Sequence, residues 1–135
     1  MIPPFNELGY LPPGIYPATL DEIDAHFGQD SEQRRAEVDS LGWMIELARE
    51  AGIQRIILNG SFVTDIMEPG DVDCVLLGGP RRGKQRAALK KLRKGLPYLA
   101  IVIARPRVFD EYISDVYATD RSDVPKGMIE VIQWT

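Results

Sequence analysis

The segment of this chain that most constrains its fold places two aspartates at the start of an apolar run. In LNGSFVTDIMEPGDVDCVLL, residues 58–77, nine residues separate the pair Gly60-Ser61 from Asp71, and Asp73 directly precedes CVLL. An apolar run of this kind is typical of a buried strand. Taking an ionised carboxylate out of water is costly unless a partner compensates for its charge. A compensating group is therefore expected beside Asp71 and Asp73.

The length and composition indicate one soluble domain over residues 1–135. The hydrophobic fraction of 44% and the charged fraction of 27% are ordinary for a globular protein. No apolar run approaches the roughly 20 residues of a membrane span, and the first residues, MIPPFNELGY, lack the pattern of a secretory signal. Cys74 is the single cysteine and is expected to be buried. An internal disulfide is thus excluded, which favours a reducing, cytoplasmic location.

The spacing of apolar residues predicts an α/β (α+β) fold with a sheet of about four strands. Residues 1–18 are rich in proline and are expected to form an extended arm packed on the domain. Thr19 and Glu22 form a capping box for a short helix, and Gly52 ends a longer one. Trp43 and Trp134 are expected to be packing residues. The predicted helices span 19–27, about 31–51, about 83–94 and 108–117, with a short helix from about 61, and the predicted strands span 53–59, 72–78, 98–104 and 128–134.

The basic residues are concentrated in one segment, although the net charge of the chain is −4. Residues 81–94, RRGKQRAALKKLRK, contain eight of the 16 Lys and Arg residues and no Asp or Glu. Such a face on an acidic protein favours an acidic or phosphate-bearing partner at one place. A helix whose charges are only solvated explains the pattern too, and both interpretations stay open. The face comprises Arg81, Arg82, Lys84, Arg86, Lys90, Lys91, Arg93 and Lys94.

The two aspartates have the spacing of paired metal ligands. A strand directs residues i and i+2 to one face, so Asp71 and Asp73 are expected to project together, about 7 Å apart at Cα. Two carboxylates this close raise each other's pKa unless a cation lies between them, and Mg²⁺ prefers such oxygen ligands. Gly60 and Ser61 begin a short helix, whose backbone N–H groups can receive a phosphate. In the alternative interpretation, EPGD is only a turn and Asp73 points to solvent.

Gly60, Ser61, Asp71 and Asp73 together resemble the signature of the DNA polymerase beta superfamily of nucleotidyltransferases. That signature is a strand, Gly-Ser at a helix start, roughly ten residues, and Asp-x-Asp on the next strand. The segments PPFNELGYLPPGIYPATLDEIDAHFG, NGSFVTDIMEPGDVD and PKGMIEVIQW look like a family of small bacterial nucleotidyltransferase-like proteins. The resemblance covers nearly the whole chain. It implies a nucleotidyltransferase-like mixed sheet, a nucleoside triphosphate held by Gly60 and Ser61, and Mg²⁺ held by Asp71 and Asp73.

The chain departs from this pattern at the third carboxylate. In active members of the superfamily a later strand carries an acid that completes the metal site, but the equivalent strand here, YLAIVIARP, has none. The register of the resemblance puts Ala100 at the missing position, with Val102 as the alternative. Glu130 is a carboxylate on another strand, one sheet position further away. Without a third acid the clamp of two metal ions is incomplete, so we expect impaired or absent transfer.

Two functions are compatible with these features. The first is a nucleotidyltransferase-like component of a bacterial toxin–antitoxin pair, in which small members of the superfamily are often found. It would bind a nucleoside triphosphate and a partner protein, toxin or antitoxin, or RNA. The second is an active nucleotidyltransferase that modifies a hydroxyl of a protein or RNA. The intact Asp71 and Asp73 favour the second function, and the missing third acid favours the first.

Overall fold

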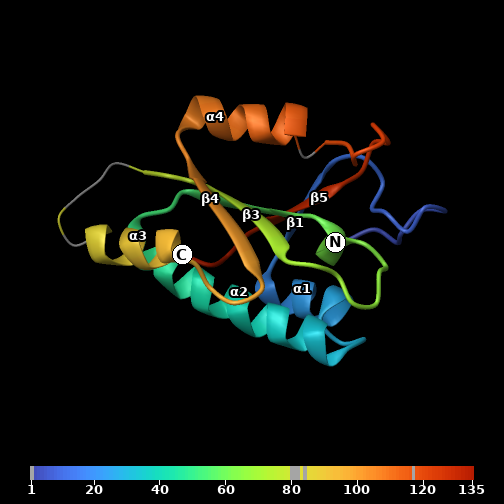
Figure 1. The fold of residues 1–135 in the computed structure, drawn as a ribbon, viewed down its shortest axis with the longest axis horizontal. Coiled ribbons are helices and arrows are strands. Elements are labelled where there is room, and N and C mark those ends of the chain that lie inside the picture. The colour runs from blue at the N-terminus through green and yellow to red at the C-terminus, as the bar shows by residue number, and fades with distance from the viewer. Residues whose placement is uncertain (1, 80–82, 84, 117) are drawn as a thin grey trace.

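The computed structural model describes residues 2–79, 83, 85–116 and 118–135 (Figure 1). These residues form a mixed α and β fold around one five-stranded sheet with the strand order β1-β5-β2-β3-β4. The strands are β1 (Ile15–Ala18), β2 (Arg55–Asn59), β3 (Val72–Leu77), β4 (Leu99–Ala104) and β5 (Met128–Val131). The helices are α1 (Leu20–Phe27), α2 (Glu32–Ala51), α3 (Gln85–Lys94) and α4 (Pro106–Glu111), with a 3₁₀ turn η1 (Ser61–Val63) and a π-helical turn η2 (Tyr112–Val116).

The sheet has one strand more than the sequence predicts. Residues 15–18, expected to be the end of an extended arm, form β1, which pairs in parallel with β5. Pro17 lies in the middle of this strand and has no backbone N–H to donate. A proline is tolerated in a strand at the edge of a sheet, and β1 is an edge strand. A strand therefore lies within a proline-rich segment whose sequence does not predict one.

The ends of the first two helices agree with their predicted capping signals. Thr19 and Glu22 form the capping box that begins α1, and Gly28 follows its last residue. Ser31 caps α2 through a hydrogen bond to its side chain, and Gly52 ends this helix with a φ of 73°. Because glycine adopts positive φ without a steric penalty, Gly52 allows the chain to leave the helix and enter β2.

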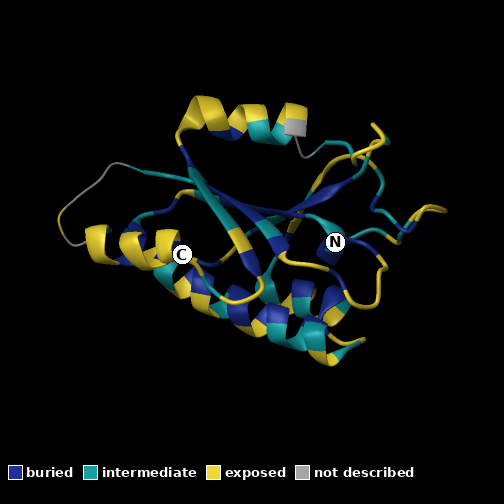
Figure 2. Ribbon diagram, in the orientation of Figure 1, coloured by how far each residue is buried: buried dark blue, intermediate teal, exposed yellow. Residues whose placement is uncertain are grey.

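The helices cover the two faces of the sheet unequally (Figure 1). Helices α1, α2 and α3 lie on one face, and α4 lies on the other. On the first face Leu58 and Cys74 belong to the larger hydrophobic core, whereas on the second Ile57 and Val75 pack with Phe109 of α4. Figure 2 shows that the buried residues lie along the sheet and on the sides of the helices that face it. Asp73 alternates with Cys74 and therefore projects on the α4 face.

The two tryptophans differ in their environments. Trp134 is buried, as expected of a packing residue, but Trp43 is 57% exposed. The prediction for Trp43 was wrong because the buried side of α2 is already supplied by Leu41, Met44 and Ala48. Trp43 lies on the opposite side of that helix.

None of the helices in the described residues is long and apolar enough to cross a bilayer.

Candidate functional site

The structure brings the four predicted site residues together at one end of the sheet. Strand β2 ends at Asn59, which pairs with Asp73 near the start of the antiparallel strand β3. The segments that follow β2 and precede β3 therefore meet at this end. They border a hollow of about 400 Å³. The hollow is lined by Asn59, Gly60, Ser61, Asp71, Asp73, Thr119, Asp120, Arg121 and Lys126.

The two aspartates differ in their exposure. Asp71 lies just before β3 and is exposed, whereas Asp73 lies within the strand and is partly buried. Burial raises the pKa of Asp73, the charge of Lys126 lowers it, and the charge of Asp71 raises it again. The side chain of Asp73 also lies close to the backbone of Gly60. This environment disfavours the interpretation in which Asp73 simply points into solvent from a turn.

Lys126 is the cation that sequence reasoning did not place at the site. Burial lowers the pKa of this ammonium group, and the charges of Asp73 and Asp120 raise it. Lys126 thus supplies part of the charge compensation that the paired aspartates require. It comes from the loop between η2 and β5, where a single lysine among polar residues gives no signal. Its place depends on how that loop folds over the sheet.

Asp120 positions the loop that carries Lys126. Its Oδ2 accepts a hydrogen bond of 2.6 Å from the Tyr10 hydroxyl, and its Oδ1 accepts from the backbone N–H groups of Ser122 and Val124. Both oxygens of this carboxylate are therefore engaged in holding the loop. The bond to Tyr10 also ties the loop to the N-terminal segment. Asp120 accordingly lines the hollow as a structural residue.

The helix predicted from Ser61 is a single 3₁₀ turn of three residues. A turn this short does not develop the macrodipole of an α-helix, so the dipole argument for phosphate binding does not apply. The Ser61 hydroxyl accepts a hydrogen bond of 2.9 Å from the Gly70 N–H. Ser61 therefore links the two ends of the loop between β2 and β3. That link holds the Gly60-Ser61 segment beside the aspartates.

Two ionisable residues of α2 are buried, and one of them, Arg34, holds the same loop. Arg34 is 2% exposed, and its guanidinium group donates to four carbonyl oxygens. Glu37 is fully buried, and neither of its carboxyl oxygens has a hydrogen-bond partner among the described residues. Burial raises the pKa of Glu37 to about 7, the charge of Arg34 opposes this shift, and that of Asp71 adds to it. The carbonyl oxygens that receive Arg34 belong to Phe27, Phe62, Thr64 and Ile66.

Sequence reasoning missed Arg34 and Glu37, although a signal was present. Both residues fall at helical spacing from Val38 and Leu41, on the side of α2 that faces the core. A charged residue in such a row indicates a buried polar contact, because the burial of an unpaired charge costs much free energy. The Arg34 guanidinium makes such contacts with carbonyl oxygens.

The strand that was expected to carry a third carboxylate has an alanine opposite Asp73. Strand β4 lies parallel to β3, and Ala100 is the residue directly opposite Asp73. Glu130 pairs with Ile57 and forms two bonds, of 2.6 and 2.8 Å, to the Arg55 guanidinium. Its carboxylate is therefore committed to another partner. Among the described residues no group of three or more Asp, Glu, His or Cys side chains is arranged to hold a metal ion.

The part of the basic segment that the structure describes does not join this site. Helix α3 buries Ala88, Leu89 and Leu92 in the core on the face of the sheet opposite Asp73. None of its residues lines the hollow at the aspartates. Five predicted basic residues are exposed on α3, and three lie outside the described residues. The five are Arg86, Lys90, Lys91, Arg93 and Lys94, and the three are Arg81, Arg82 and Lys84.

Comparison with known proteins places nearly the whole chain in one family. Residues 3–132 match the family of unknown function DUF6932. The chain belongs to this family. No curated protein and no solved structure matches the chain. The matched range of DUF6932 includes the Gly60-Ser61 pair, both aspartates and Lys126, so every charged residue of the site lies within the family unit.

Proposed function

We propose that this DUF6932 protein has a nucleotidyltransferase-like fold and binds a nucleoside triphosphate with Mg²⁺ at the hollow beside Asp71 and Asp73. Its transfer activity is impaired or absent. The observation that carries the proposal is the convergence of Gly60, Ser61 and the two aspartates on one hollow. These are the residues through which the sequence resembles the DNA polymerase beta superfamily.

The residues present fit a magnesium ion whose coordination shell is completed by the substrate. Asp71 and Asp73 would hold the ion, because Mg²⁺ in nucleotide sites uses one or two carboxylates together with substrate phosphates and water. Burial already disfavours the charged form of Asp73, and a divalent cation would offset this cost. The ion would neutralise the charge of the phosphates. Gly60, Ser61 and Lys126 line the same hollow and would contact phosphate oxygens.

The reason for weak or absent transfer lies on β4. Deprotonation of an attacking hydroxyl needs a carboxylate or a second metal ion close to the reacting phosphate. Ala100 offers a methyl group opposite Asp73, and Glu130 is bound to Arg55. The chain can therefore position a triphosphate without supplying the base for the transfer step. An active nucleotidyltransferase is the second candidate, and the intact pair of Asp71 and Asp73 favours it.

The proposed setting is a cytoplasmic toxin–antitoxin type pair in bacteria. The resemblance of the sequence to small nucleotidyltransferase-like proteins supports this role. The partner would be a toxin or antitoxin protein, or an RNA, bound by the exposed basic residues of α3. Charge reversal at Lys90, Lys91 and Lys94 should then abolish binding to the neighbouring-gene protein or to RNA, with little change in melting temperature. The binding should also weaken as salt rises.

The nucleotide proposal is tested by thermal stability with ligands. ATP or GTP with Mg²⁺ should raise the melting temperature of the wild type, because a ligand that binds only the folded state stabilises it. The shift should vanish in Asp71→Asn/Asp73→Asn. A control variant, Glu50→Gln/Asp115→Asn, removes the same charge at exposed positions outside the hollow and should keep the shift. Equal shifts in both double variants would contradict the proposed site.

A further inference from the structure

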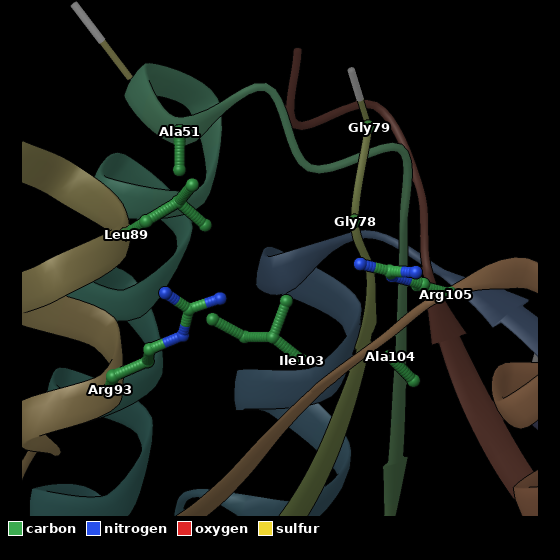
Figure 3. Close-up of a pocket in the computed structure, with 8 residues that line it drawn as sticks. All are labelled: Ala51, Gly78, Gly79, Leu89, Arg93, Ile103, Ala104 and Arg105. Atoms are coloured by element: carbon green, nitrogen blue, oxygen red, sulfur yellow. The ribbon is translucent and has the colours of Figure 1, made fainter. Parts of the chain in front are cut away.

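A second hollow lies at the opposite end of the sheet, between α3 and the end of β4 (Figure 3). Its volume is about 310 Å³. Strands β3 and β4 run in parallel from the paired residues Asp73 and Ala100 to the pair Leu77 and Ala104. The hollow adjoins the latter pair and therefore lies about the length of a strand away from the aspartates.

Two arginines from different elements line this hollow. Arg93 belongs to the last turn of α3, and Arg105 follows β4 as the cap residue of α4. Figure 3 shows the side chains on opposite walls, with both guanidinium groups directed into the space between them. Among the described residues that line the hollow none is acidic. In the described part of the chain, neither arginine forms an ion pair with a carboxylate.

The rest of the lining is apolar or backbone. Ala51, Leu89, Ile103 and Ala104 contribute hydrocarbon surface, and the chain at Gly78 and Gly79 contributes backbone. A concave site with an apolar surface and a few converging charged groups is typical of small-molecule binding. Two convergent guanidinium groups select an anion, since each can donate two parallel hydrogen bonds to phosphate oxygens. The wall on the α3 side continues into a neighbouring hollow lined by Arg86, Leu89, Lys90 and Arg93, which adds positive potential.

We propose that the hollow binds a small phosphate ester, with its phosphate between Arg93 and Arg105 and its organic part on Leu89 and Ile103. Proteins that bind single-stranded RNA combine a basic groove with aromatic side chains on which bases stack. In the part of the chain that the structure describes, no aromatic residue lines either hollow at this end of the sheet. A small ester therefore fits the lining better than RNA does. This site is independent of the nucleotide site at Asp71 and Asp73.

The proposal is tested by NMR titration of ¹⁵N-labelled protein without Mg²⁺, using inorganic phosphate, adenosine monophosphate and sodium chloride at equal ionic strength. The two phosphate probes should cause saturable shifts of the backbone amides of Gly78, Gly79 and Arg105. Adenosine monophosphate should bind more tightly than inorganic phosphate, because its organic part also contacts the apolar surface. Sodium chloride should not reproduce the pattern. Saturable shifts confined to the aspartate end of the sheet would overturn the proposal.

Two double variants of equal charge separate a built site from general attraction. Arg93→Gln/Arg105→Gln should weaken binding of adenosine monophosphate by roughly tenfold or more, because hydrogen bonds to both charged groups are lost. Arg35→Gln/Arg107→Gln removes two cations that lie outside the basic face and outside both hollows at this end of the sheet, and it should leave the affinity within about twofold. Equal weakening in both variants would overturn the proposal, because the loss of net charge would then explain the weaker binding.

A third variant tests the geometry of the two groups. Arg93→Lys/Arg105→Lys keeps the charge but loses the planar fork, so it should also bind the ester more weakly than the wild type. Unchanged affinity in this variant would overturn the bidentate site. Binding of single-stranded RNA at this end of the sheet, with no saturable shift from either small probe, would overturn the choice of a small ester. Asp71→Asn/Asp73→Asn should bind adenosine monophosphate here as the wild type does, whatever happens to triphosphate binding.

Discussion

The carboxylate of Asp73 lies against the backbone of Gly60, so that a Cβ atom added to Gly60 would stand 2.8 Å from Asp73 Oδ2. Gly60 also has a φ of 87°, in the region that residues with a side chain rarely adopt. Both facts require glycine at this position. The first residue of the Gly-Ser pair is thus explained by contact with the second aspartate, and the two halves of the motif depend on each other.

Gly60→Ala should therefore destabilise the fold and displace Asp73. We expect a loss of roughly 1–3 kcal/mol in the free energy of unfolding, from the strained backbone and the close contact. Urea denaturation measures this loss. Gly42→Ala is the matched control, since Gly42 lies inside α2 and an added Cβ meets nothing within 4 Å. The control should gain about 0.5–1 kcal/mol from better helix propensity. A stable Gly60→Ala protein would contradict the contact with Asp73.

Arg34→Met should unfold the loop that carries the site. The guanidinium is the common donor to carbonyl oxygens of residues 62, 64 and 66, and methionine leaves these buried acceptors without it. We expect a loss of about 3 kcal/mol or more, and loss of any triphosphate-induced thermal shift. Arg35→Met is the neighbouring control, because Arg35 is partly exposed and forms its shortest ion pair with Asp24. Such a pair contributes about 0–1 kcal/mol.

The sequence predicts those elements of the fold whose signals come from neighbouring residues. Helix α2 was predicted well because its range of about 31–51 and the Gly52 that ends it follow from neighbouring residues. Strand β1 was not predicted, because the pairing partner that makes Pro17 acceptable lies more than 100 residues away in β5.

The same distinction applies to the site. Gly60 and Asp73 are close in sequence, and their spacing on two successive strands indicates that they meet. Lys126 reaches the hollow only through the fold of its loop, held by Tyr10 and Asp120. No local pattern marks such a residue. Arg34 and Glu37 lie between these cases, since their positions in the apolar row of α2 predict burial but not their partners.

Glu37 should make the stability of the protein depend on pH near neutrality. Its pKa is about 7 in the folded protein against 4.5 in the absence of burial. Because the folded state holds this proton more tightly, the free energy of unfolding falls as pH rises from about 4.5 to about 7 and changes no further above that. The fall amounts to about 3 kcal/mol.

Glu37→Gln should remove this part of the pH dependence, since an amide does not ionise. Denaturation at several pH values measures the difference between the wild type and the variant, which should grow from pH 5 to pH 7 in favour of the variant. Glu50→Gln, at an exposed position of the same helix, should leave the wild-type profile unchanged. A constant difference between the wild type and Glu37→Gln across this pH range would show that the carboxyl is ionised throughout.

Ala100→Asp tests whether the missing carboxylate accounts for the expected lack of transfer. Ala100 is exposed and lies opposite Asp73 in the parallel register, so an aspartate there would project beside Asp73 without entering the core. The added acid should tighten binding of Mn²⁺, used as a spectroscopic substitute for Mg²⁺, by roughly tenfold through one more carboxylate ligand. Ala100→Asn is the isosteric control and should bind Mn²⁺ nearly as the wild type does.

In an assay with radiolabelled ATP and the neighbouring-gene protein or bulk RNA, the wild type should incorporate no more than traces of label, and Ala100→Asp should incorporate more. Robust transfer by the wild type that depends on Asp71 and Asp73 would overturn the inactive interpretation, and it would require that a group of the substrate takes up the proton that the third carboxylate normally accepts.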